Sequence, residues 1–217
     1  MVEGFSENFV NSFKKALMKY DGDDDGIVTP EELSKHSLFG IEKYPDLKEK
    51  AASVFEQYAM KDGQADISPE EYKMILNSHE FNELRDEYEV REYEKRQEIR
   101  KNGTIEYPEI DYSKPIDKNK LAEYNDFLES LDYFNEYGLI AEEVVERGTS
   151  FSLYKDLEER AIKSLQQFAE KDWNEEVSAE EYARWLESPE YKKIDEEYHD
   201  RQALEIIERR KEEEGEQ

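Results

Sequence analysis

The fold of this chain is decided by the stretch Asp21-Gly22-Asp23-Asp24-Asp25-Gly26-Ile27-Val28-Thr29-Pro30-Glu31-Glu32. Oxygen-bearing side chains stand at its first, third, fifth, ninth and twelfth places, and a glycine stands at its sixth. Ca²⁺ is a hard cation that takes six to eight oxygen ligands, and this spacing wraps oxygens around one point. The stretch therefore predicts a calcium-binding loop.

Each expected ligand has its own part in the loop. A glycine at the sixth place allows the sharp turn, and the ninth place often holds a water molecule. An acidic surface turn would not need Gly26, the aliphatic Val28 and the final glutamate in this register together. The predicted ligands are Asp21, Asp23, Asp25, Ile27 through its backbone carbonyl, Thr29, and Glu32 through both carboxylate oxygens.

Helices are predicted on both sides of this loop. Ser6 can cap a helix that runs to about Tyr20, with apolar residues at helical spacing. Pro30 stands where a second helix begins. A further helix is predicted over residues 46–58. The order is therefore helix, loop, helix.

A second loop of the same kind is predicted at 60–71. Its tail Ile-Ser-Pro-Glu-Glu-Tyr copies the Val-Thr-Pro-Glu-Glu-Leu of the first loop, which fixes the register. Met60 then occupies the first place without a side-chain oxygen, and Ala65 replaces the glycine. We expect the fold to be kept and the metal to be lost. Val28 and Ile67 should lie opposite each other in a short two-stranded ribbon.

The second half of the chain repeats the first. Ser68-Pro-Glu-Glu-Tyr matches Ser178-Ala-Glu-Glu-Tyr, and Asp46-Leu-Lys-Glu-Lys-Ala matches Asp156-Leu-Glu-Glu-Arg-Ala. Such a repeat favours two lobes built on one plan. We predict an N-terminal lobe with a charged helix over 1–103, a linker over 104–116, and a C-terminal lobe with a charged helix over 117–217.

The second half offers two weaker loops. In the loop at 132–143, Asp132, Glu136 and Glu143 keep their places, but Phe134 and Tyr137 interrupt the pattern. In the loop at 170–181, Glu175 replaces the turn glycine. The candidate ligands of this fourth loop are Glu170, Asp172, Asn174 and Glu181.

These four stretches resemble the loops of the EF-hand superfamily, most closely at 21–32. The arrangement is similar to that of two-lobed proteins with four EF-hands, such as the calmodulin-like and sarcoplasmic calcium-binding groups, with one intact and three degenerate loops. The resemblance implies an all-α fold of two lobes of paired EF-hands, each followed by an extra charged helix. It also implies Ca²⁺ as the bound ion.

The two charged helices, predicted at 79–101 and 189–214, have two interpretations. Phe81, Leu84 and Tyr88 form an apolar stripe whose spacing is repeated by Tyr191, Ile194 and Tyr198. The stripes either join the core of their own lobe or dock a partner. Beyond its stripe, the first helix should be a solvated helix held by its own opposite charges three and four residues apart.

Composition limits the function. The 217 residues carry a net charge of −27 and 12 % aromatic residues, which argues against nucleic acid as a partner and against a disordered chain. There is no cysteine, no phosphate-binding glycine loop and no nucleophile or zinc-protease motif. The three histidines have no partner spacing, so we expect no enzyme. Neither a signal peptide nor a membrane span is recognisable, so a cytoplasmic location is expected.

Three functions remain open. The first is a calcium-binding regulatory or adaptor protein that contacts another protein, through a basic or amphipathic segment of that partner. The second is a structural component of a cytoskeletal or other large assembly. The third is a calcium buffer, although one good loop binds little calcium per chain.

Overall fold

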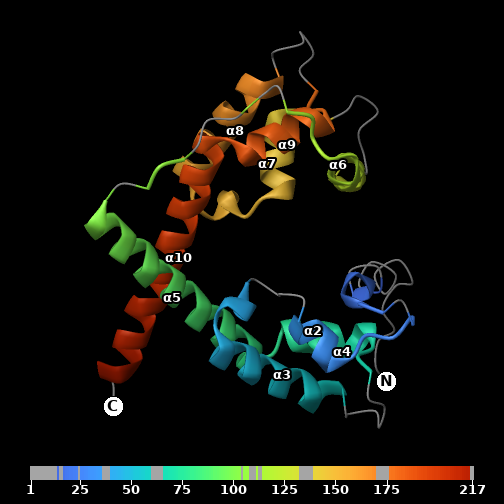
Figure 1. Ribbon diagram of the computed structural model, residues 1–217. Coiled ribbons are helices and arrows are strands. Elements are labelled where there is room, and N and C mark those ends of the chain that lie inside the picture. The colour runs from blue at the N-terminus through green and yellow to red at the C-terminus, as the bar shows by residue number, and fades with distance from the viewer. Residues whose placement is uncertain are drawn as a thin grey trace, which may run out of the picture. The chain divides into compact units, whose positions relative to one another are not determined.

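The structure is a computed structural model in which helices and connecting segments are described for most of the chain (Figure 1). The described residues are 14, 17–23, 25–35, 40–59, 66–103, 105–107, 111, 114–131, 139–169 and 176–215. Most of the helix predicted to end at Tyr20 lies outside them, and so do residues 60–65, 132–138 and 170–175.

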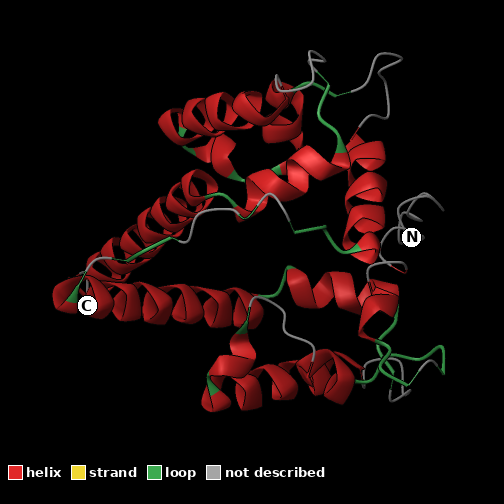
Figure 2. Cartoon of the chain, turned by 45° about the horizontal axis from the view of Figure 1, so that its top comes forward, coloured by secondary structure: helices red, strands yellow, loops and turns green. Residues whose placement is uncertain are grey.

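The fold is all-α, as the sequence predicts. Within the described residues the helices are joined by loops, and the only strand-like pairing is an isolated antiparallel bridge between Ile140 and Glu176 (Figure 2). The chain divides into two compact units, Met1–Glu92 and Tyr93–Gln217. The division falls inside one helix, upstream of the segment 104–116 that the sequence predicts as a linker.

In the described part of unit 1, two short helices flank the first loop, and a further short helix and three longer ones follow it. Its elements are η1 (Met18–Tyr20), α2 (Pro30–Lys35), η2 (Ile41–Lys43), α3 (Pro45–Ala59), α4 (Pro69–Leu76) and the first part of α5 (His79–Asn102). Its core contains fully buried side chains from α2, α3, α4 and α5, among them Leu33, Phe55, Ile75 and Phe81.

Unit 2 repeats this order after the second part of α5. Its elements are α6 (Lys118–Leu131), α7 (Ala141–Gly148), η3 (Phe151–Leu153), α8 (Lys155–Ala169), α9 (Ala179–Glu187) and α10 (Pro189–Gly215). Trp185 is fully buried at the centre of this core, and its indole Nε1 donates a hydrogen bond to Ser164 at 3.2 Å. A buried indole N–H needs such a partner, so this contact fixes the ring.

Equivalent helices begin with equivalent caps. At α4, the Ser68 hydroxyl accepts a hydrogen bond from the amide of Glu71, and the Glu71 carboxylate accepts from the amide of Ser68. Ser178 and Glu181 make the same reciprocal bonds at α9. This capping box satisfies backbone donors that have no partner inside the helix. The Ser-x-x-Glu repeat in the sequence thus reflects a local backbone requirement.

Among the described residues, a backbone hydrogen bond joins the segments that precede α2 and α4 in unit 1, and another joins the segments that precede α7 and α9 in unit 2. The amide of Ile67 donates to the carbonyl of Val28 at 2.8 Å, and the amide of Val177 donates to the carbonyl of Leu139 at 2.7 Å. The predicted contact between Val28 and Ile67 is confirmed, but neither residue lies in a strand, so the described residues do not form the predicted two-stranded ribbon. All four side chains are buried, so the paired backbone lies inside the apolar core of its unit.

The apolar stripes of the two charged helices belong to the cores of their own units. Phe81 and Leu84 of α5 and Ile194 of α10 are buried, while Tyr88, Tyr191 and Tyr198 pack against the same cores. The interpretation of these stripes as lobe core is therefore confirmed. The predicted helix over 79–101 is confirmed as well, since α5 spans His79–Asn102.

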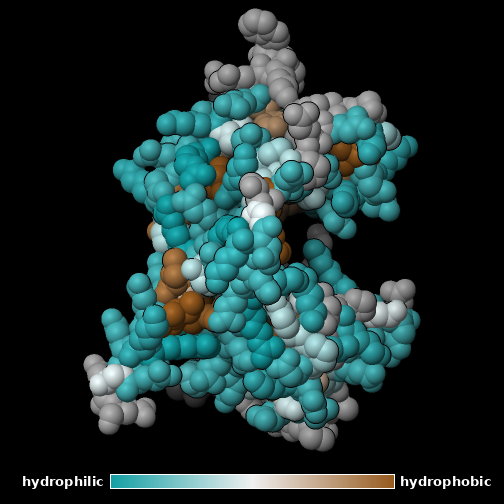
Figure 3. All heavy atoms as spheres, turned by 60° about the vertical axis from the view of Figure 1, so that its left-hand side comes forward, coloured by the Kyte–Doolittle hydropathy of each residue, from teal (hydrophilic) through white to brown (hydrophobic). Residues whose placement is uncertain are grey.

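The expectation that the second part of α5 is held by its own charges is wrong. Arg96 and Arg100 instead form ion pairs with Asp200 of α10, and Arg100 also pairs with Glu196 at 3.0 Å. Intrahelical spacing does not reveal a partner a hundred residues away, so the sequence alone could not show this contact. Elsewhere the visible face of the molecule is mainly hydrophilic, as the net charge requires (Figure 3).

Candidate metal centre

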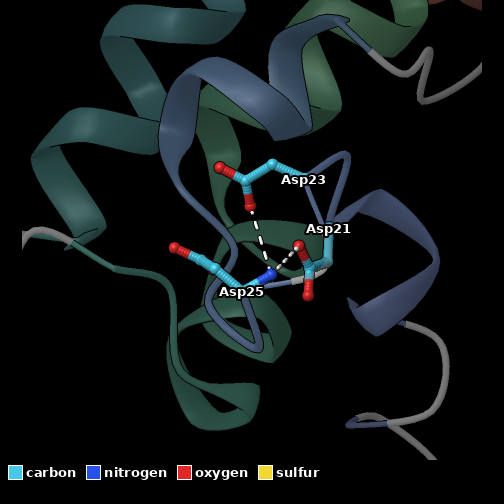
Figure 4. A group of neighbouring side chains, drawn as sticks. All are labelled: Asp21, Asp23 and Asp25. Carbon is cyan, nitrogen blue, oxygen red and sulfur yellow. Dashed lines mark hydrogen bonds between the residues drawn. The ribbon is translucent and has the colours of Figure 1, made fainter.

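Three aspartates gather where the sequence predicts the calcium loop. One carboxylate oxygen from each of Asp21, Asp23 and Asp25 lies within 4.8 Å of the others (Figure 4). Asp21 is half-buried and the other two are exposed. The loop that carries them runs from the end of η1 to the start of α2. Like charges at this separation repel one another, so other contacts must hold the three side chains together.

Hydrogen bonds from the loop's own amides hold these side chains. Asp21 accepts from the amides of Asp25 at 3.2 Å and Gly26 at 2.8 Å, and Asp23 accepts from the amide of Asp25 at 3.2 Å. Asp25 accepts from the amide of Ile27 at 2.8 Å. The carboxylates are therefore oriented by backbone that turns beneath them, and no distant element is needed to place them.

Gly26 makes that turn possible. Its φ of +84° lies in the left-handed region, and a Cβ added there would meet nothing within 4 Å. The glycine is required by backbone conformation and not by lack of space. The sequence-based reason for the glycine at the sixth place is confirmed in this respect.

Glu32 closes the loop by joining its two ends. One carboxylate oxygen accepts from the amide of Gly22 at 3.0 Å, and the other accepts from the amide and the hydroxyl of Thr29, each at 2.9 Å. The bonds from the Thr29 amide and hydroxyl and from the Gly22 amide lower the pKa of Glu32 below its ordinary value. Glu32 is therefore held as a carboxylate that bridges the two ends of the loop, but its oxygens are not among those that gather with the three aspartates.

The electrostatics of the group favour a cation. The pKa of Asp23 is lowered by its bond from the Asp25 amide, but desolvation and the negative charges of Asp25, Glu32 and Asp21 together outweigh that bond. The net result is a pKa above the ordinary value. Uncompensated negative charge is thus concentrated in the loop.

The donor set fits a hard divalent cation. The residues offer carboxylate oxygens from Asp21, Asp23, Asp25 and Glu32, and a carbonyl from Ile27, which are the ligand types that Ca²⁺ takes. The stretch 21–32 itself contains no sulfur or imidazole donor. The Glu32 oxygen that accepts only from the Gly22 amide keeps lone-pair capacity for a metal, whereas the other oxygen already accepts two hydrogen bonds from Thr29.

Only the end of the second loop is described. Glu71 has 5 % of its surface exposed, and the capping box engages one of its carboxylate oxygens, Oε2. Its other oxygen is buried and has no hydrogen-bond partner in the described part of the chain. The predicted loss of metal from this loop stays a prediction, because Asp62 and Gln64 lie outside the described residues.

The third and fourth loops are also described only at their ends. Glu143 accepts a hydrogen bond from the amide of Ile140 and pairs with Arg147 at 3.2 Å, so its charge is partly compensated. Glu181 serves the cap of α9. The other predicted ligands of these loops, Asp132, Glu136, Glu170, Asp172 and Asn174, lie outside the described residues.

Sequence reasoning missed one set of paired residues. Arg91 and Asp46 in unit 1, and Arg201 and Asp156 in unit 2, form equivalent bidentate ion pairs. The repeat aligned the two aspartates, and extending that alignment along the two charged helices would have aligned the arginines too.

No family model, curated protein or solved structure matches the chain. Among the described helices, none combines the length and the apolar composition needed to cross a membrane. The candidate site therefore stands on its own geometry.

Proposed function

We propose that this chain is a calcium-binding regulatory or adaptor protein of the EF-hand type, which acts by contacting another protein and not by catalysis. The observation that carries the proposal is the group of three aspartates inside a turn of twelve residues that Glu32 closes. The site would hold Ca²⁺ through Asp21, Asp23, Asp25, the Ile27 carbonyl and Glu32, with Thr29 at the place that often carries a water.

Calcium is favoured over magnesium by the nature of the donors. Mg²⁺ keeps several waters and is usually bound by one or two carboxylates, whereas Ca²⁺ accepts a cage of six to eight protein oxygens. Four carboxylates around one divalent ion leave a surplus of negative charge that calcium relieves. An affinity in the sensor range, about 10⁻⁷–10⁻⁵ M, is therefore expected.

The backbone pairing supports a paired arrangement of loops in each unit. The bond between Val28 and Ile67 has a counterpart between Leu139 and Val177. A metal-induced change in the first loop would reach its unit through this pairing and through α2.

We place the protein in the cytoplasm, in keeping with the sequence-based expectation.

The experiment is a calorimetric titration with calcium of the wild type and of Glu32→Gln. We expect one dominant ion per chain, and an affinity at least about ten-fold weaker in the variant, since even outer-shell changes cost about 10–100-fold. Glu31→Gln is the matched control: its carboxylate pairs with Lys35 at 2.8 Å and is not a predicted ligand. Equal affinities for the wild type and Glu32→Gln would refute the site.

A structural component of a cytoskeletal or other large assembly is the second candidate. It is favoured by the ion pairs that join α5 to α3, α5 to α10 and α10 to α8. Such ion pairs suit a rigid structural component. Calcium would then stabilise the loop without signalling. A buffer, the third candidate, would bind at least two ions per chain at micromolar calcium, and the same titration counts them.

A further inference from the structure

The end of α5 carries the single Asn-Gly pair of the sequence, Asn102-Gly103. Asn102 is the last residue of α5, and Gly103 follows it outside the helix. Both residues are exposed, and both line an open groove of about 470 Å³ that also includes Lys95 and Ile99. Water therefore reaches the side-chain amide of Asn102 and the peptide bond that follows it.

An asparagine before a glycine brings together a carbonyl carbon and a nitrogen that can react with each other. The Cγ carbon of the Asn102 side chain and the backbone nitrogen of Gly103 belong to adjacent residues, so their reaction is intramolecular and closes a small ring. A reaction within one chain avoids the loss of freedom that two separate molecules would suffer. Glycine has no Cβ, so its nitrogen is unobstructed and its backbone rotates readily.

Little in the fold holds Asn102 in place. Among the residues that the structure describes, its side chain makes no hydrogen bond. Because α5 ends at this residue, the backbone here belongs to a helix terminus, which opens at a lower free energy than the middle of a helix. A Cβ on Gly103 would meet nothing within 4 Å, so the space around that residue is open. The reacting geometry is therefore accessible without unfolding of the core.

The chain also contains a restrained counterpart, Asn77-Ser78. The Asn77 side chain donates a hydrogen bond to the carbonyl of Lys73 at 2.8 Å. The Ser78 amide donates to the carbonyl of Ile75 at 2.9 Å, and Ser78 is only 6 % exposed. The carbon and the nitrogen of this pair are thus both held by contacts that must break before the two atoms can react.

We propose that Asn102-Gly103 is a self-modification site, at which Asn102 is converted to aspartyl and isoaspartyl residues without an enzyme. The Gly103 nitrogen loses its proton to solvent hydroxide and attacks Cγ of Asn102. A bond forms between these two atoms, the bond from Cγ to the side-chain nitrogen breaks, and that nitrogen leaves as ammonia with a proton from water. The product of this step is a cyclic imide.

Water then opens the cyclic imide. Addition to Cγ breaks its bond to the Gly103 nitrogen and gives an aspartyl residue with the ordinary backbone. Addition to the main-chain carbonyl carbon of the same residue breaks the other carbon–nitrogen bond and gives an isoaspartyl residue, whose backbone runs through the side-chain methylene. One water is consumed and one ammonia is released for each Asn102 converted, and the reaction needs no oxidant or cofactor. The proposal does not depend on the calcium site.

Either product changes the end of α5. Its new carboxylate lies at the negative end of the helix dipole, which weakens the last turn. The isoaspartyl product also lengthens the backbone before Tyr107, which donates a hydrogen bond to Glu196 of α10 and whose ring centre lies 5.9 Å from the Nζ of Lys193. We therefore expect the amides in the last turn of α5 to exchange faster in the modified chain.

The test ages the full chain at physiological temperature and mildly alkaline pH in a calcium chelator, both folded and in guanidinium chloride. Mass spectrometry of its peptides measures the conversion of each asparagine, and electron-transfer fragmentation separates aspartyl from isoaspartyl products. We expect the rate at Asn102 in the folded chain to lie within about ten-fold of its rate in denaturant, a barrier difference below about 1.4 kcal/mol. At Asn77, the fold should slow the conversion by more than about ten-fold.

Gly103→Ala tests the attacking nitrogen. The added Cβ would meet nothing within 4 Å and the backbone there has no positive φ, so the fold is kept. We expect the conversion of Asn102 to slow by about ten-fold or more, because the new side chain obstructs the nitrogen. Gly215→Ala, at an exposed glycine with equally open surroundings, is the matched control and should leave the rate unchanged. Absence of conversion at Asn102, protection of Asn102 by the fold as strong as that of Asn77, or a rate unaffected by Gly103→Ala overturns the proposal.

Discussion

Two glycines of unit 1 show how one residue can be fixed by backbone conformation. Gly26 and Gly40 have φ values of +84° and +82°, in the region that other residues adopt only with strain. They differ in their surroundings. A Cβ on Gly26 would meet nothing within 4 Å, whereas a Cβ on Gly40 would lie 2.9 Å from the Tyr88 hydroxyl. The two positions therefore separate conformational strain from steric conflict.

Gly26→Ala should lower the free energy of unfolding by about 1–2 kcal/mol, the usual cost of a left-handed conformation for a residue with a Cβ. Gly40→Ala should cost more, because the Tyr88 hydroxyl must also move. Urea unfolding in a calcium chelator measures both. Gly103→Ala is the control, since a Cβ there meets nothing within 4 Å and Gly103 has no positive φ. Equal effects at positions 26 and 103 would show that the turn does not require glycine.

At the scale of elements, the ion pair between Asp46 of α3 and Arg91 of α5 joins two packed helices through exposed charges. The bidentate hydrogen bond from Arg91 lowers the pKa of Asp46 to about 2. The same contact from Arg201 lowers the pKa of Asp156. A carboxylate whose pKa is lower in the folded state stabilises the fold above its ordinary pKa and loses that contribution as the pH falls.

The stability difference between the wild type and Asp46→Asn should therefore depend on pH. It should be constant above about pH 5, where Asp46 is ionised in both the folded and the unfolded states, and shrink towards zero between about pH 4 and pH 2. Urea unfolding across this range measures it. Asp156→Asn should show a trend of the same sign. A difference that stays constant down to pH 2 would mean that Arg91 does not interact preferentially with the ionised carboxylate.

Sequence features within a few residues of each other predicted the helices and their caps well. They could not predict contacts between residues far apart in the chain. The helix expected at 46–58 is α3, Pro45–Ala59, and the Ser68-Pro69 start is confirmed by its capping box. Such features depend on neighbours within four residues, so the sequence displays them directly. The pairing of Arg96 with Asp200 joins residues 104 positions apart and leaves no local periodicity. Only a fold that brings α5 and α10 together reveals it.

The candidate site was predictable for a similar reason. Asp21, Asp23 and Asp25 belong to one short loop, so the spacing that placed them in sequence also places them in space. The loop-closing bonds of Glu32 to Gly22 and Thr29 were not predicted, since they depend on the direction of one side chain. The burial of Glu71, whose Oε1 has no hydrogen-bond partner among the described residues, could not be anticipated from its place in the loop pattern.

At the scale of the whole molecule, a net charge of −27 makes bound cations a source of stability. A ligand that binds only the folded state at a concentration of 100 times its Kd adds about 2.7 kcal/mol. This gain should be concentrated in unit 1, where the described aspartate group lies. If calcium acts as a signal, protection should spread beyond the loop into the helices of that unit. If it acts only as a stabiliser, protection should remain within 21–32.

The most direct test of the central claim is amide hydrogen exchange of the full chain with and without calcium. We predict that calcium slows exchange of the amides of Asp25, Gly26 and Ile27, and that of Ile67 across the backbone pair, while Glu32→Gln abolishes the change. Slower exchange in these segments would place the ion in the loop that the sequence and the aspartate group indicate. Exchange at residues 21–32 that is unaffected by saturating calcium would contradict the account.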